Sequence, residues 1–199
     1  MDGAVLSGIA RGLAVAESSN DTSAPTTGHA LFVRHQRGVN QLVYQLLGPD
    51  AEHDDIVQDV FVRVLSRASS LRDPERERAW VHSVAVNVVR NHLRRRRVRR
   101  IVELHPAPPD EVVRTEPVLV ARDLVQRGYR VLGRIAPANR IALILRRVQG
   151  RSIDEVAALC KCSRATVKRR VQRAEAELEN LLAEDPDLRE QLGRRGSGS

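Results

Sequence analysis

Two helical periods of apolar residues, separated by one short break, run through residues 153–174. In the first period Ile153 and Val156 share a helix face behind Ser152, a residue type that caps helix N-termini. In the second period apolar positions again recur every three or four residues, and Ser163 stands where it would cap the helix. Two short helices joined by a tight turn are typical of a helix-turn-helix.

The same periodicity predicts helices on both sides of residues 101–117, a segment rich in proline and acidic residues. We therefore predict an all-α fold with two small helical bundles joined by a flexible linker, the second bundle carrying the helix-turn-helix. The predicted divisions are a flexible leader at 1–29, a first bundle at 30–100, the linker at 101–117, a second bundle at 118–184 and a tail at 185–199, disordered from residue 193.

The charge of the chain predicts a polyanionic partner, because the formal net charge is +8. Arginines crowd residues 90–100 without one acid, and the helix after Ser163 has a basic face over residues 164–173. A cationic face of this kind is also found on solvated amphipathic helices. Following a short supporting helix, however, it favours contact with DNA phosphates and guanine edges in a major groove.

Other chemistry is poorly supported. Cys160 and Cys162 fit buried small residues in a reducing compartment better than a metal site, and the histidines have no ligand spacing. The acidic cluster in residues 50–55 could suggest a two-metal nuclease, but carboxylates at a helix start are more simply explained by the macrodipole. We expect no metal, no cofactor and no membrane insertion.

At residues 30–183 the chain resembles bacterial RNA polymerase sigma factors of the extracytoplasmic-function branch. Residues 54–65 are similar to the region-two helix that docks on the polymerase clamp. Trp80 with residues 84–96 is similar to the helix that melts and reads the minus-10 element. Residues 155–174 are similar to region four, which reads the minus-35 element. The chain departs from the family pattern at Lys161, where glycine is common, and at Asn91, where an acid is common.

The resemblance implies an initiation factor with no catalytic residues of its own. Its expected setting is the cytoplasm, with core RNA polymerase and promoter DNA as partners and an anti-sigma factor as a further candidate. The implied polymerase-binding residues are Asp55, Gln58, Asp59, Phe61 and Val62. The implied minus-10 residues are Trp80, Asn87, Asn91, Arg94 and Arg95, with Trp80 either a core anchor or a platform for an unpaired base. The implied minus-35 residues are Ser163, Arg164, Thr166, Lys168, Arg169 and Arg173.

Two other classes compete with this interpretation. A dimeric helix-turn-helix regulator would need a self-complementary surface rather than an acidic docking helix. A serine recombinase would need alternating strands in the N-terminal half to carry its nucleophile, and the helical periodicity there does not provide them.

Overall fold

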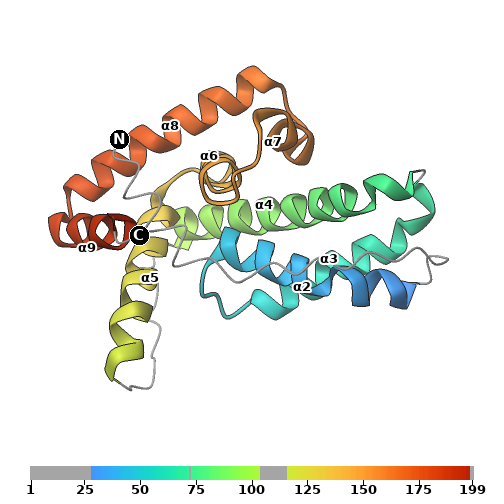
Figure 1. Ribbon diagram of the computed structural model, residues 1–199, viewed down its shortest axis with the longest axis horizontal. Coiled ribbons are helices and arrows are strands. Elements are labelled where there is room, and N and C mark those ends of the chain that lie inside the picture. Colours follow the sequence, from blue (N-terminus) through green and yellow to red (C-terminus); the bar gives the residue numbers. More distant parts are fainter. Residues whose placement is uncertain (1–27, 72, 104–115, 198–199) are drawn as a thin grey trace.

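The computed structural model describes residues 28–71, 73–103 and 116–197, and every element within these ranges is helical (Figure 1). The predicted all-α fold class is therefore confirmed. The first module, residues 28–103, comprises α2 (Gly28–Leu47), α3 (His53–Ser66), the short turns η1 (Ala68–Ser70) and η2 (Pro74–Arg76), and α4 (Glu77–Glu103). The second module, residues 116–197, comprises α5 (Glu116–Arg134), α6 (Pro137–Leu143), the π-helical turn η3 (Ile144–Val148), α7 (Ile153–Cys160), α8 (Arg164–Ala183) and α9 (Pro186–Ser197). Most of the predicted leader and linker lies outside the described residues.

Local sequence explains where the helices of the first module begin and end. α2 stops at Gly48, whose φ of 79° is readily adopted by glycine. Asp54 and Asp55 occupy the first turn of α3, where negative charge complements the helix dipole. Glu77 begins α4 and is buried against α2, where its Oε1 accepts hydrogen bonds from Arg34 and His35. This buried carboxylate fixes the start of α4 relative to α2.

The second module follows the predicted helical pattern up to the end of α8. Pro137 opens α6, and Ser152 opens α7 with a reciprocal capping box, in which the Ser152 hydroxyl accepts from the Glu155 amide and the Glu155 carboxylate accepts from the Ser152 amide. α8 packs its apolar stripe against α6. The stripe consists of Val167, Val171, Ala174, Leu178 and Leu182, all of them buried.

The segment predicted as a tail differs from expectation, because residues 186–197 form α9. Asp185 accepts a hydrogen bond from the Leu188 amide and so caps the helix. Leu188 and Leu192, one turn apart, are 0% and 4% exposed. α9 packs against α5 and α8, so the disorder predicted from residue 193 is wrong for residues 193–197. The polar composition of the segment concealed a narrow two-leucine stripe.

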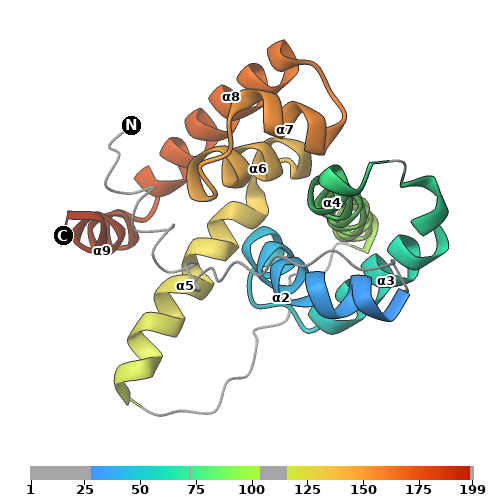
Figure 2. The same cartoon turned by 45° about the vertical axis from the view of Figure 1, so that its right-hand side comes forward.

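α4 is the central helix, in contact with α2 and α3 of the first module and with α6 and α7 of the second. Figure 2, which looks nearly along α4, shows these two pairs of helices on opposite sides of it. The buried apolar residues of both modules form one continuous cluster. The two modules are therefore packed together into one body.

Candidate nucleic-acid interface

The turn between α7 and α8 has the geometry of a helix-turn-helix. The Cys162 amide donates to the Ala157 carbonyl at 3.0 Å, which closes the C-terminus of α7. Lys161 takes the left-handed conformation, with φ 50° and ψ 54°. Ser163 then caps α8 by accepting from the Thr166 amide at 3.2 Å, as its sequence position predicts.

The outer face of α8 is basic and open to solvent. Arg164, Lys168 and Arg169 are exposed, and so is Arg173 one turn further on. Arg164 lies 3.2 Å from an Asp154 carboxylate oxygen, a pair in which both side chains are more than half exposed. Among the described residues, Lys168, Arg169 and Arg173 have no hydrogen-bond or ion-pair partner. Cations held apart from acids on one helix face are available to a polyanion.

The residues around the start of α8 are less exposed than its basic side chains. Thr166 is half-buried, and its hydroxyl shares a hydrogen bond of 2.9 Å with the Ser163 hydroxyl. Cys162 is half-buried, with Arg170 Nη1 3.6 Å from its sulfur. Burial raises the pKa of the Cys160 thiol to about 11, so this residue behaves as a small apolar group.

The second basic element is the C-terminal half of α4. Arg94 and Arg95 are exposed, whereas Trp80, Asn87 and Asn91 are half-buried. Trp80 packs against the apolar core and keeps part of its surface open. Both interpretations of its role, core anchor and stacking platform, are compatible with this placement.

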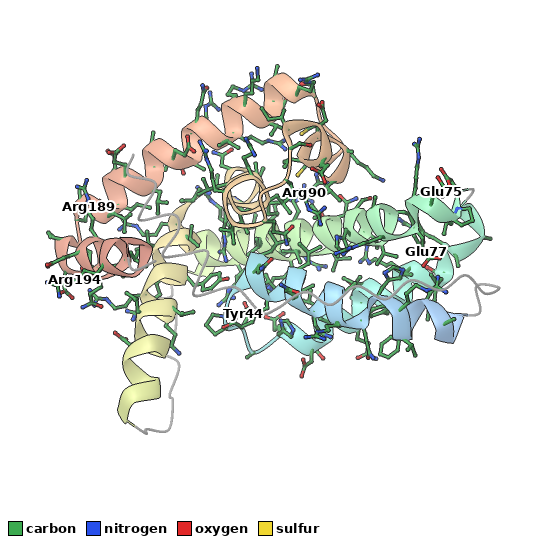
Figure 3. The ribbon with its side chains drawn as sticks, viewed as in Figure 1. Tyr44, Glu75, Glu77, Arg90, Arg189 and Arg194 are labelled. Atoms are coloured by element: carbon green, nitrogen blue, oxygen red, sulfur yellow. The ribbon has the colours of Figure 1, made fainter. Side chains whose placement is uncertain are left out.

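Several basic side chains near these residues have partners within the chain. Arg96 pairs with Asp50 in the turn after α2. Arg90 donates to Asn87 on its own helix, and to the Cys160 carbonyl of α7 at 3.3 Å. Figure 3 shows Arg90 on the side of α4 that faces the second module. Of the two basic faces, that of α8 is freely exposed, whereas α4 is partly engaged within the molecule.

The implied polymerase-binding residues on α3 divide into exposed and buried side chains. Asp55 and Gln58 are exposed, and Asp59 is half-buried in an ion pair with Arg63. Val62 is 58% exposed, which is high for an apolar side chain. Phe61 is only 4% exposed, so it is a core residue of the first module and not a surface contact.

The structure adds apolar residues to this surface that the sequence motif did not include. The Phe32 ring stands edge-on to the Phe61 ring, with centroids 4.7 Å apart, and covers it. Phe32, Val33 and Leu65 are 39%, 52% and 44% exposed. We call Phe32, Val33, Val62 and Leu65 the α2–α3 apolar patch. Val33 could have been recognised because it lies off the phase of the core stripe, whereas Phe32 lies seven residues before buried Val39 and shares the phase of that stripe.

Within the described ranges, no group of three or more histidine, cysteine or acidic side chains is arranged to hold a metal ion. No helix among those residues is long and apolar enough to cross a membrane. The chemistry that these surfaces support is binding, through exposed cations on α8 and α4 and through an apolar patch on α2 and α3.

Two family models match the chain, one within each module. The model of sigma-70 region 2 matches residues 31–99, and that of sigma-70 region 4 matches residues 129–178. A sigma factor SigE of the extracytoplasmic-function group from Mycolicibacterium smegmatis is 26% identical over 175 residues, covering 86% of this chain and 68% of the relative. The corresponding sigma-E factor of Escherichia coli is 28% identical over 162 residues, covering 76% of this chain and 84% of the relative.

A solved structure shares the fold. It is the sigma factor RpoE of Bartonella quintana in complex with the anti-sigma factor NepR, with a TM-score of 0.56, 24% identity, and coverage of 79% of this chain and 97% of that one. The two matched regions lie in the order and at the positions of the two modules described above. The chain thus belongs to the sigma-70 family, in its extracytoplasmic-function branch, and is a promoter-specific transcription initiation factor.

Proposed function

We propose that this factor divides its work among three surfaces. The α2–α3 apolar patch with exposed Asp55 and Gln58 docks on core RNA polymerase. The outer face of α8 reads the minus-35 element, and the basic half of α4 holds the melted minus-10 strand. Polymerase supplies all the chemistry and the chain itself catalyses no reaction. Its place of action is the cytoplasm, where its polymerase and promoters are, and an anti-sigma factor is a further partner.

The observation that carries the proposal is that basic side chains on the outer face of α8 have no acidic partner among the described residues. One face of this helix is buried without a gap, and the opposite face presents Lys168, Arg169 and Arg173 without partners in the described structure. Holding like charges together costs free energy unless a polyanion lies alongside. A capped, rigidly packed helix with such a face fits a major groove.

A reconstituted transcription assay tests the function as a whole. Purified core polymerase is supplied with a promoter library and with either wild-type chain or a Lys168→Ala, Arg169→Ala variant. We expect discrete run-off transcripts only with the wild-type chain, and these transcripts identify its promoter. A chain that repressed transcription, or left core polymerase without promoter-dependent products, would refute the proposal and favour a dimeric regulator.

Single substitutions on α8 separate base reading from phosphate binding. Arg164→Ala, Lys168→Ala and Arg169→Ala are titrated with minus-35 duplexes of the recovered promoter and its single-base variants at several salt concentrations. Loss of an arginine that reads guanine should cost roughly 1–3 kcal/mol of discrimination at one base pair. Loss of a phosphate contact should weaken all sequences alike and lower the salt slope by about one.

Arg189→Ala is the matched control, because Arg189 is an exposed arginine of the same module that lies on α9, away from the turn (Figure 3). Its affinity and salt slope should remain at wild-type values. Equal losses for every sequence in all of the α8 variants would reduce this helix to an electrostatic clamp and place specificity in DNA shape.

A further inference from the structure

The charge of α8 changes sign partway along the helix. From Arg164 to Arg173 the helix holds cations and no acid, and beyond this stretch come Glu175, Glu177 and Glu179. Carboxylates at this point would repel DNA phosphates, so the contact with DNA ends near Arg173. Ten helical residues span about 14 Å, which is the length of about four base pairs of duplex. α8 therefore has room for only a few side chains that read bases.

Helical geometry divides the exposed side chains of this stretch into a central ridge and two flanks. Each residue turns the helix by about 100°, which places Arg169 about 180° away from the buried stripe of α8. Ala165 and Gln172, one turn before and one turn after Arg169, are exposed on the same side, and we call these three residues the α8 ridge. Lys168 and Arg173 lie on either side of the ridge. The ridge points outwards, because α6 and α7 lie on the inner side of α8 (Figure 1).

The chemistry of the ridge differs from that of its flanks. Lys168 and Arg173 are cations placed for the phosphates on the two sides of a groove, and such contacts position a protein without reading sequence. At the centre of the ridge, the Arg169 guanidinium can donate to O6 and N7 of a guanine. Gln172 is the only amide side chain in residues 164–173, and it neutralises no phosphate. Its amide has a donor group and an acceptor, the pattern that matches N7 and N6 of an adenine.

From this placement we propose that Gln172 is a specificity-determining residue, which reads an adenine in the base pair next to the guanine read by Arg169. Residues three apart are separated by about 4.5 Å along the helix axis, which is closer to one base-pair step than to two. Ala165 has only a methyl group, so it lets the start of α8 approach the floor of the groove. The minus-35 element of this factor therefore holds a guanine and an adenine in neighbouring base pairs.

Gln172 is not among the minus-35 residues that the family resemblance implies. Its role follows from its place on the ridge, its exposure and its amide chemistry. The inference rests on the proposed function, because it assigns the minus-35 element to the outer face of α8.

A side chain that reads a base and a cation that binds a phosphate have different effects when they are removed. Gln172→Ala should lower discrimination about tenfold at one base pair and leave the salt slope unchanged, because no charge is lost. Gln172→Glu should change the preference at that pair from adenine to cytosine. A carboxylate accepts from N4 of cytosine and offers no donor to N7 of adenine. Lys168→Ala should weaken binding to all sequences alike and lower the salt slope by about one.

The test uses holoenzyme reconstituted from core polymerase and the full chain, either wild type or with one of these substitutions or Arg169→Ala. Competition binding measures its affinity for the promoter recovered by run-off and for duplexes with every single-base change in the minus-35 element, at several salt concentrations. Asn180→Ala is the matched control. Asn180 is a second exposed amide on the same side of α8, about 12 Å further along and beyond the first acidic residues.

The base pair affected by Gln172→Ala should adjoin the pair affected by Arg169→Ala, and Asn180→Ala should match the wild type at every pair. A folded Gln172→Ala chain, judged by circular dichroism, with unchanged discrimination or with equal losses for all sequences would overturn the inference. An affected pair that does not adjoin the Arg169 pair would also overturn it. Failure of the proposed function would show earlier, as an absence of promoter-dependent run-off with the wild-type chain, and the inference would fail with it.

Discussion

At the scale of single residues, backbone conformation in the helix-turn-helix is set by two positions with positive φ. Lys161 has φ 50° and Gly150, just before α7, has φ 66°. A residue with a Cβ pays for the left-handed region through contact with its own carbonyl, whereas glycine does not. No atom would lie within 4 Å of a Cβ added at Gly150, so a substitution there tests conformation alone.

We predict that Lys161→Gly stabilises the chain by about 0.5–1 kcal/mol, because relief of the left-handed strain exceeds the entropy that glycine adds to the unfolded state. Gly150→Ala should destabilise it by about 1 kcal/mol for the opposite reason. Urea unfolding followed by circular dichroism measures both. Shifts of the same sign in the two variants would show that side-chain contacts, rather than φ, dominate at one of these sites.

His82 gives a pH dependence at the residue scale. Its imidazole is buried on α4, and burial, with Arg151, Arg78 and His35 nearby, lowers its pKa from 6.5 to about 4. The unfolded chain therefore binds this proton at a higher pH than the folded chain does. The stability that neutral His82 confers is complete above pH 6.5 and is lost as the pH falls from 6.5 towards about 4.

Over this window the wild type should lose about 3 kcal/mol through His82, and a His82→Gln variant should lack this part of the slope. The measurement is the free energy of unfolding in urea at half-unit steps of pH. Burial raises the pKa of Glu77, but hydrogen bonds from His35 and Arg34 outweigh it and lower that pKa from 4.5, so such acidic groups contribute only from the lower end of this window downwards, and in both proteins. Parallel curves for the two proteins would mean that His82 is not the group that titrates.

At the scale of elements, short amphipathic helices become stable by burying one stripe against a neighbour. α9 shows how little apolar surface this requires when caps and ion pairs assist. Asp185 caps the helix, and Arg127 of α5 binds both Asp185 and Asp187. Those hydrogen bonds lower the pKa of the Asp185 carboxyl, first through the Leu188 amide and then through Arg127.

Truncating the α9 stripe should therefore weaken the second module. Leu188→Ala removes a side chain that is 0% exposed, and we expect a loss of about 2–4 kcal/mol in the free energy of unfolding. Glu190→Ala, on the exposed face of α9 in a pair with Arg194, should cost less than about 0.5 kcal/mol. Similar small losses for both would indicate that α9 detaches from the bundle in solution.

At the scale of the whole molecule, the position of α4 between the modules decides which surfaces are free. The second module covers one side of α4, while α2 and α3 lie on the other and carry the α2–α3 apolar patch (Figure 2). The patch is thus exposed while the two modules are packed together.

Docking by the patch predicts a sharp effect of one exposed valine. Val62→Glu should abolish co-elution with core polymerase in size-exclusion chromatography, because it buries a charge in an apolar contact. Val98→Glu is the matched control, since Val98 on α4 is 55% exposed against 58% for Val62 and lies outside the patch. Undiminished co-elution of a folded Val62→Glu chain would move the docking site elsewhere.

Much of the fold and of the α8 surface could be predicted from sequence, because those features depend on neighbours along the chain. Ser152 and Ser163 were correctly identified as caps, since capping involves residues three apart. The exposed basic face of α8 followed from the same periodicity that buried Val167 and Val171. Phe61 was wrongly placed on the surface, because the ring that covers it, Phe32, comes from another helix.

The sequence by itself determined the helices, the turn chemistry and the sign of the partner's charge. All three follow from local spacing and from the charge of the chain. Only the tertiary structure decided which faces and ends of those helices contact the other module. The hydroxyl of Tyr129 meets the carbonyl of Gln45, 84 positions earlier, and Arg90 meets a carbonyl 70 positions later. Backbone carbonyls are present at every residue, so no pattern of side chains marks which of them a distant donor will cap. That choice depends on how the two modules pack.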